Sequence, residues 1–280
     1  MSRCLSFLLA PFLFVGSVAR AEGPVSITVP LHVDHGVIFF DAAVDGRGPF
    51  AFILDPGAEG GITGDTLHQL GRTDSETAAV SLSIGTAKLG KLPLRVFDGD
   101  GSYLYPKHDP SGPPIAGTLG PEILQRFAMR LDYSHATLTL TPLETFEYHG
   151  SGEALPVVFH DAMPLITASA DGVSGLFAYD VRAPGKLMLF HPFLAEHGFL
   201  GRYGVAPSAD NPMVAGVLHK LGLAGAVLTD QPATFAGFTT GKFAAADEAG
   251  ILGYGVLSQF ITTVDYRRKL IYFEPVMPRP

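Results

Sequence analysis

The 280-residue sequence is 47% hydrophobic and only 16% charged, a composition that supplies a large buried core and excludes an intrinsically disordered chain. Its formal net charge is −8, and its longest basic cluster is Arg267-Arg268-Lys269, so nucleic acid is not an expected partner. The 33 glycines and 22 prolines are scattered along the chain, which is typical of many short strands and predicts an all-β protein.

The first 21 residues have the pattern of a secretory signal peptide. Arg3 supplies a basic start, residues 5–15 an apolar core, and Ala19-Arg20-Ala21 a cleavage site. The apolar core is too short to span a bilayer, so we expect an exported protein, periplasmic or secreted, without a stable membrane anchor. The single cysteine lies in this segment, so the rest of the chain has neither disulfides nor cysteine metal ligands.

An apolar run at residues 50–54 ends on Asp55, and Pro56-Gly57 turn the chain immediately. Five apolar residues without polar alternation predict a strand that is covered on both faces. An ionised carboxylate buried at the end of such a strand costs several kcal/mol unless a partner stabilises it. Asp55 is therefore a candidate catalytic residue. The alternative is an aspartate that only caps the following turn.

The chain contains an internal repeat with an offset of 133 residues. Residues 116–127 (AGTLGPEILQRF) align with residues 249–260 (AGILGYGVLSQF), and the Asp-Tyr pair at 132–133 aligns with the Asp-Tyr pair at 265–266. The register continues through this stretch without a gap. Such a long match is not expected by chance and predicts a duplicated fold.

Upstream of this stretch the offset falls to about 125, as loops of different length would allow. There the strand that ends on Asp55 matches a strand that ends on Asp180. Each half begins with two strands joined by a tight turn, passes through its aspartate into a short helix, and closes with a pair of strands. We predict a first lobe at residues 22–149 and a second lobe at 154–280, joined by a short polar linker.

The segments around the two aspartates resemble a known family. Residues 52–58 (FILDPGA) and 177–183 (FAYDVRA) stand where the retropepsin/pepsin class of aspartic proteases has Asp-Thr-Gly-Ala. The segments TLG at 118–120 and ILG at 251–253 are similar to the apolar-apolar-Gly element that backs the catalytic loop in that class. The chain resembles its duplicated two-lobe form found among exported bacterial proteins, over nearly all of its length after the signal.

The resemblance implies a two-lobed, all-β fold of the pepsin type with a cleft between the lobes. It implies that the cleft binds an extended peptide or protein, with a flap near residues 80–89, and that Asp55 and Asp180 form the catalytic pair. Two carboxylates that share one proton activate a water and polarise the scissile carbonyl without metal or organic cofactor. The oligomeric state is left open.

The sequence departs from the family pattern beside both aspartates. The family's threonine, which hydrogen-bonds across the lobe interface, is replaced by Pro56 and Val181. Gly57 keeps the glycine of the first motif, but Arg182 replaces that of the second, and a guanidinium there is expected to hold the second aspartate ionised and to fill the cleft. We therefore favour a peptide-binding protein with impaired or no catalysis. The alternative is an active aspartic endopeptidase.

Other catalytic and metal-binding patterns are weaker. The sequence has no Gly-x-Ser-x-Gly nucleophile motif and no His-Glu-x-x-His zinc motif. Residues 98–102 (DGDGS) begin like a calcium loop, but Tyr103 stands where that loop needs glycine. His191 and His197 flank a predicted short helix and are expected to be solvated or to cap it. We expect no metal site and no cofactor.

Overall fold

The structure, a computed structural model, describes residues 26–99, 115–185, 187–208 and 210–276. The predicted signal peptide (1–21) and most of the calcium-like segment lie outside the described residues, so both remain predictions. In the part of the chain that the structure describes, no helix is long and apolar enough to cross a membrane.

Strands dominate both halves of the chain, which repeat the same order of strands, while the described residues of the second half include two additional short helices, α4 (Phe199–Tyr203) and η2 (Lys242–Ala244). The first half consists of β1 (Ile27–Pro30), β2 (His32–Asp34), β3 (Val37–Val44), β4 (Arg47–Leu54), β5 (Gly61–Thr63), α1 (Gly64–Gln69), β6 (Thr77–Ile84), β7 (Ala87–Phe97), β8 (Ile115–Leu119), α2 (Pro121–Leu124), β9 (Phe127–Asp132) and β10 (Thr137–Pro142). The second half consists of β11 (Glu153–Pro156), β12 (Val158–His160), β13 (Met163–Ala170), β14 (Val173–Tyr179), β15 (Leu187–Leu189), α3 (His191–Glu196), α4 (Phe199–Tyr203), β16 (Met213–Leu223), β17 (Ala226–Ala236), the 3-10 helix η2 (Lys242–Ala244), β18 (Gly250–Leu252), α5 (Tyr254–Leu257), β19 (Phe260–Asp265) and β20 (Leu270–Pro275).

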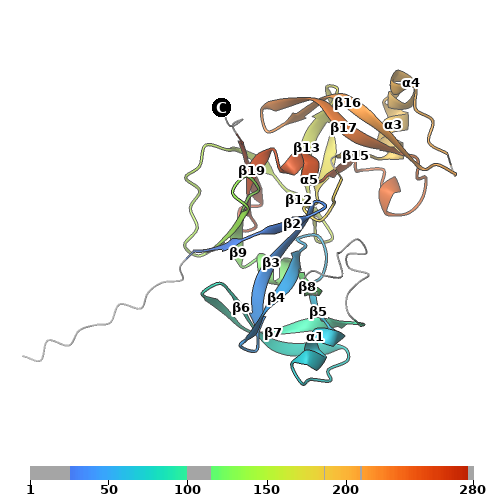
Figure 1. Ribbon diagram of the computed structural model, residues 1–280. Coiled ribbons are helices and arrows are strands. Elements are labelled where there is room, and N and C mark those ends of the chain that lie inside the picture. Colours follow the sequence, from blue (N-terminus) through green and yellow to red (C-terminus); the bar gives the residue numbers. More distant parts are fainter. Residues whose placement is uncertain (1–25, 100–114, 186, 209, 277–280) are drawn as a thin grey trace, which may run out of the picture.

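Each half forms one lobe, and a third sheet joins the two lobes. The seven-stranded sheet of the first lobe has the order β2-β3-β4-β8-β5-β7-β6, and that of the second has the equivalent order β12-β13-β14-β18-β15-β17-β16. Figure 1 shows the first lobe below, in blue to teal, and the second above, in yellow to orange. The six-stranded sheet β1-β10-β9-β19-β20-β11 takes three strands from each half and so fixes the lobes to one another.

The element boundaries confirm the internal duplication that the sequence predicts. The bounds of α2 and α5, of β9 and β19, and of β10 and β20 are each separated by the predicted 133 residues. β3 and β13 differ by 126 residues at both ends, close to the smaller offset expected upstream. The two-lobed all-β fold is therefore confirmed, while the boundaries at 22–149 and 154–280 stay predictions.

The tight turn that opens each lobe has a clear cause in the sequence. Asp45 and Gly46 join β3 to β4, and Asp171 and Gly172 join β13 to β14; all four residues have positive φ, between 45° and 86°. A two-residue hairpin turn of type I′ needs positive φ at both central positions, and Asp-Gly satisfies this at low cost. These turns set the register of the strands that run to Asp55 and Asp180.

A flap near residues 80–89 was predicted over the cleft, and the structure shows this prediction to be wrong. β6 and β7 form a hairpin there, but a Cβ on Gly85 in its turn would lie 3.0 Å from Val29 of β1, in the sheet that joins the lobes. No residue of this hairpin turn lines the two hollows beside Asp180 that are described below. The local sequence predicts a hairpin, but the pairing of β6 with β3 decides which way the hairpin points.

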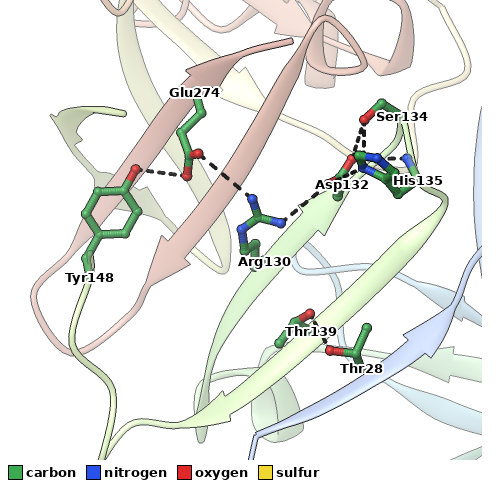
Figure 2. A network of polar contacts seen from close by, with 8 residues as sticks. All are labelled: Thr28, Arg130, Asp132, Ser134, His135, Thr139, Tyr148 and Glu274. Atoms are coloured by element: carbon green, nitrogen blue, oxygen red, sulfur yellow. Dashed lines mark hydrogen bonds and ion pairs between the residues drawn. The ribbon is translucent and has the colours of Figure 1, made fainter. Parts of the chain in front are cut away.

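A network of polar contacts on the six-stranded sheet ties the two halves together (Figure 2). Arg130 of β9 lies between the carboxylates of Asp132 (3.5 Å) and Glu274 (3.9 Å), the latter on β20 of the other half. The Tyr148 hydroxyl donates to Glu274 (3.0 Å) and accepts from the Gly152 N–H (2.7 Å), so the linker between the lobes is anchored to the sheet. The two lobes are therefore held at a defined distance, which positions the site between them.

Candidate active site

Equivalent strand ends position the two candidate aspartates. β4 pairs in parallel with β8, and the Asp55 N–H donates to the Leu119 carbonyl (3.0 Å). In the second lobe β14 pairs in parallel with β18, and the Asp180 N–H donates to the Leu252 carbonyl (3.2 Å). The same backbone geometry thus presents one carboxylate from each lobe, as the duplication predicts.

One oxygen of each carboxylate closes its own turn. Asp55 Oδ1 accepts the Gly57 N–H (3.2 Å), and Asp180 Oδ1 accepts the N–H groups of Arg182 (3.0 Å) and Ala183 (3.1 Å). Each aspartate therefore does cap the turn that follows it, which is the alternative that the sequence left open. The turn contacts involve only Oδ1, and Oδ2 of Asp55 has a different partner.

Arg182 joins the two aspartates. Its guanidinium crosses from the second lobe, and Nη1 donates to Asp55 Oδ2 at 2.8 Å, while its backbone N–H binds Asp180. The Asp55 side chain is 5% exposed and that of Arg182 is 35% exposed, so the ion pair is buried on the aspartate side and open on the arginine side. One residue thus contacts both carboxylates, and Asp55 and Asp180 belong to a single site, which we call the aspartate pair.

The electrostatic effect of Arg182 differs from the sequence-based expectation. We expected its guanidinium to hold Asp180 ionised, but the pKa of Asp180 is raised, first by burial and then by the negative charge of Asp55. The expectation was wrong because the guanidinium reaches across the interface to Asp55 instead. Lys242 acts in the opposite direction on Asp180, as do the turn N–H groups, without overcoming desolvation.

The two positions that lack threonine are buried. Pro56 is buried, and Val181 is fully buried within the main hydrophobic core, so apolar contacts occupy the places of the missing hydroxyls. The lobes also contact one another through turns and loops. A Cβ on Gly57 would lie 2.3 Å from Met163 of the second lobe, and one on Gly36 would lie 2.8 Å from the Pro184 carbonyl. The sequence did not identify these contacts, because they depend on how the lobes meet.

The apolar-apolar-Gly elements do back the two loops, and both need glycine. A Cβ on Gly120 would come within 2.4 Å of the Ala58 carbonyl, and one on Gly253 within 2.4 Å of the Gly185 carbonyl. Glu122 supports the first loop further by accepting the N–H groups of Gly60 and Gly120, each at 3.2 Å. The sequence analysis did not single out Glu122. It could have done so, because Glu122 lies in the first turn of α2 and the repeat places Gly255, which has no side chain, at the equivalent position of the second lobe.

Two hollows lie beside Asp180, and both are lined mainly by the second lobe. The apolar hollow, of about 380 Å³, lies against residues 182–185, 187–188 and η2. The polar hollow, of about 340 Å³, reaches His160 and Glu248. They share Asp180, Lys242 and Ile251, so together they form one groove past the second aspartate. From the first lobe only Gly57 lines this groove among the described residues.

One cluster of side chains at the edge of the polar hollow could hold a metal ion. The ligand atoms of His160, Asp247 and Glu248 lie within 4.8 Å of one another, the only such group in the described part of the chain. His160 Nδ1 lies 2.9 Å from Glu248 Oε1, and this contact is the main cause of a raised pKa of His160. The carboxylate contact favours the protonated imidazole, which would have to lose its proton before it could ligate a metal ion.

The other histidines singled out by the sequence lie away from the aspartate pair. His191 is the first residue of α3 and His197 follows its last residue, as expected for residues that flank a short helix. Neither lines the two hollows described above.

Comparison with known proteins adds evidence on the fold. No family model matches this sequence, and no curated protein matches it. Among solved structures, the crystal structure of an aspartic proteinase from Irpex lacteus matches with a TM-score of 0.58 and 10% sequence identity, over 90% of this chain and 98% of that one. The match covers both lobes, so the fold is the two-lobed pepsin-like fold with internal duplication.

The raised pKa of Asp180 predicts a specific dependence of stability on pH. A carboxyl group whose pKa is higher in the folded state stabilises fully below its unfolded pKa, about 3.9, and this contribution is lost as pH rises through the folded pKa. Asp180→Asn needs no ionisation, so we expect it to raise the melting temperature at pH 7 by about 2–4 °C, or about 1 kcal/mol, and to have less effect at pH 4.

Thermal unfolding at the two pH values measures this effect. Asp55→Asn is the matched control, because it removes the partner of Arg182 and is expected to lower the melting temperature at pH 7. If Asp180→Asn and Asp55→Asn lowered the melting temperature equally at pH 7, burial would not raise the pKa of Asp180 as described.

Proposed function

We propose that this chain is an exported protein that binds extended peptides in the groove beside the aspartate pair and has lost all or nearly all peptide hydrolysis. The observation that carries the proposal is the guanidinium of Arg182 on Asp55 Oδ2 at 2.8 Å. The secretory pattern of residues 1–21 supports export, and the two-lobed pepsin-like fold supports a peptide as the ligand.

Hydrolysis by an aspartate pair needs a carboxylate oxygen that can accept a proton from the attacking water. In this site Asp55 Oδ1 accepts the Gly57 N–H and Oδ2 accepts a hydrogen bond from the Arg182 guanidinium, so each oxygen of Asp55 already has a partner. The guanidinium therefore competes with the attacking water for Asp55 Oδ2. We infer that it displaces the water from the oxygen that would accept its proton.

The alternative, an active aspartic endopeptidase, is favoured by one observation. A working pair holds one proton, and here the raised pKa of Asp180 beside an ion-paired Asp55 favours that charge state. The charge state alone does not hydrolyse a peptide, because water must also reach a free carboxylate oxygen. We therefore place binding ahead of cleavage.

Peptide capture tests the proposal. A pool of peptides from an unrelated denatured protein is passed over the immobilised protein at pH 5–7, and the retained peptides are eluted and identified by mass spectrometry. We expect peptides to be retained and recovered intact. Thr234→Arg, which projects into the apolar hollow from β17, should reduce retention at least roughly 10-fold, whereas Thr229→Arg, on an exposed part of the same strand, should not.

Failure to retain peptides, or equal retention by Thr234→Arg, would overturn peptide binding in this groove. Recovery of cleaved peptides would instead support the endopeptidase.

A further inference from the structure

The apolar hollow combines a hydrophobic wall with positive charge. Its apolar residues belong to, or pack against, a small hydrophobic cluster of the second lobe that is separate from the main core; those with side chains on the hollow include Ala183, Met188, Phe243 and Ile251. Phe243 is held in place by edge-on contacts with Phe190 (5.8 Å between ring centroids). An exposed wall of this kind, built on a packed cluster, suits an apolar side chain of a ligand.

The walls of the hollow are held firmly by backbone contacts. The Tyr254 N–H donates to the Ala183 carbonyl (2.9 Å) and the Gly255 N–H to the Gly185 carbonyl (3.2 Å), which fixes the loop after Asp180 on the start of α5. The close approach at Gly253 leaves no room for this loop to move inward. The hollow is therefore preformed and needs little ordering when a ligand binds.

Two positively charged side chains line the same hollow, and only one of them has an ion-pair partner among the described residues. Arg182 is paired with Asp55. Lys242, exposed at the start of η2, forms no ion pair with a described residue, and its charge acts on Asp180, whose pKa is nevertheless raised. Because Lys242 lines the hollow, is exposed and has no ion-pair partner among the described residues, its charge is available to attract an anion from the ligand.

An apolar wall next to a positive charge suits one part of a peptide better than the others, namely its C-terminal residue. An internal Asp or Glu brings a carboxylate without an apolar group, and an internal Leu or Phe brings an apolar group without charge. The C-terminal residue carries both on one Cα, because its free α-carboxylate adjoins its side chain. Its carboxylate can reach a cation while the side chain lies on the apolar wall.

We propose that the apolar hollow binds the C-terminal end of a peptide whose last residue is apolar, with Lys242 as the residue that recognises the free carboxylate. This inference rests on the proposed peptide-binding function and specifies its ligand. It makes Lys242 a specificity-determining residue, and Phe243 and Ile251 the apolar contacts of the terminal side chain.

Fluorescence polarisation with N-terminally labelled nonapeptides that end in leucine tests this inference. The same peptide is prepared as free acid and as C-terminal amide, with a third version that ends in a glutamate amide. We expect the free acid to bind about 10-fold more tightly than either amide, with a difference that shrinks as salt rises. Lys242→Met should lower the affinity for the free acid to that for the amide and leave the amide unchanged.

Lys220→Met is the matched control, because Lys220 is exposed on β16 and does not line the hollow. Equal binding of free acid and amide, preference for the glutamate amide, or an equal loss for acid and amide in Lys242→Met would overturn the inference while leaving peptide binding in place. Absence of binding by every peptide would overturn both the inference and the proposed function.

Discussion

Removing the Arg182 side chain and restoring two hydroxyl groups is expected to give this protein peptide cleavage that depends on Asp55. In the variant Pro56→Thr/Val181→Thr/Arg182→Gly, Asp55 Oδ2 is released from the guanidinium and becomes available to water. General acid–base catalysis contributes about 10²–10⁴-fold in rate. We therefore expect the triple variant to cleave at least about 100-fold faster than the wild-type protein, between about pH 3 and 6.

Arg182→Gly alone should account for most of this gain, because it removes both a charge and a steric block. The threonines restore hydrogen bonds across the interface, each worth about 1 kcal/mol, and contribute mainly through positioning. Both replace buried apolar residues, so the folding of each variant is checked by circular dichroism and thermal unfolding.

The triple variant that also carries Asp55→Asn is the control for this experiment. A folded triple variant that retains peptides but shows no Asp55-dependent cleavage would place the defect elsewhere. The β6–β7 hairpin, whose turn packs against β1 and does not line the hollows beside Asp180, then becomes the leading explanation. Equal activity of wild type and triple variant would mean that Arg182 does not silence the site.

The largest effects on stability are expected from the glycines that back the two aspartate loops. Gly253→Ala places a methyl group about 2.4 Å from the Gly185 carbonyl, and Gly120→Ala places one 2.4 Å from the Ala58 carbonyl. Backbone atoms cannot move away as the end of a flexible side chain can, so each substitution should lower the free energy of unfolding by about 3 kcal/mol.

Urea denaturation measures both losses. Gly201→Ala in α4 is the matched control, because a Cβ there meets no atom within 4 Å, and it should change stability by less than about 0.5 kcal/mol. A loss no larger than that of the control at Gly253 would mean that the loop after Asp180 does not pack as described. Similar losses at both glycines would agree with two equivalent loops.

The fold could be predicted because its signals are local and occur twice. The apolar run before Asp55 predicts a buried strand, and the match of residues 116–127 with 249–260 predicts that a second copy exists. The β3–β4 and β13–β14 turns follow from Asp-Gly, which tolerates positive φ. Each of these inferences needs only the residues within one element and its neighbours.

The site could be predicted only in part, because its decisive contacts cross between lobes. The sequence identifies Asp55, Asp180 and Arg182 as neighbours of the same motifs, but not the direction of the Arg182 side chain. The packing of Met163 on Gly57 likewise depends on how the lobes meet. Side chains at an interface are determined by tertiary packing, which neither spacing nor propensity encodes.

Cleavage of denatured protein by the wild-type chain tests the central claim most directly. The protein and its Asp55→Asn variant are incubated with a denatured substrate at intervals between about pH 3 and 6, and the release of new peptide amines is followed over hours. We predict that the two proteins are indistinguishable, because Arg182 already occupies Asp55. Robust cleavage by the wild type that Asp55→Asn abolishes would contradict the account.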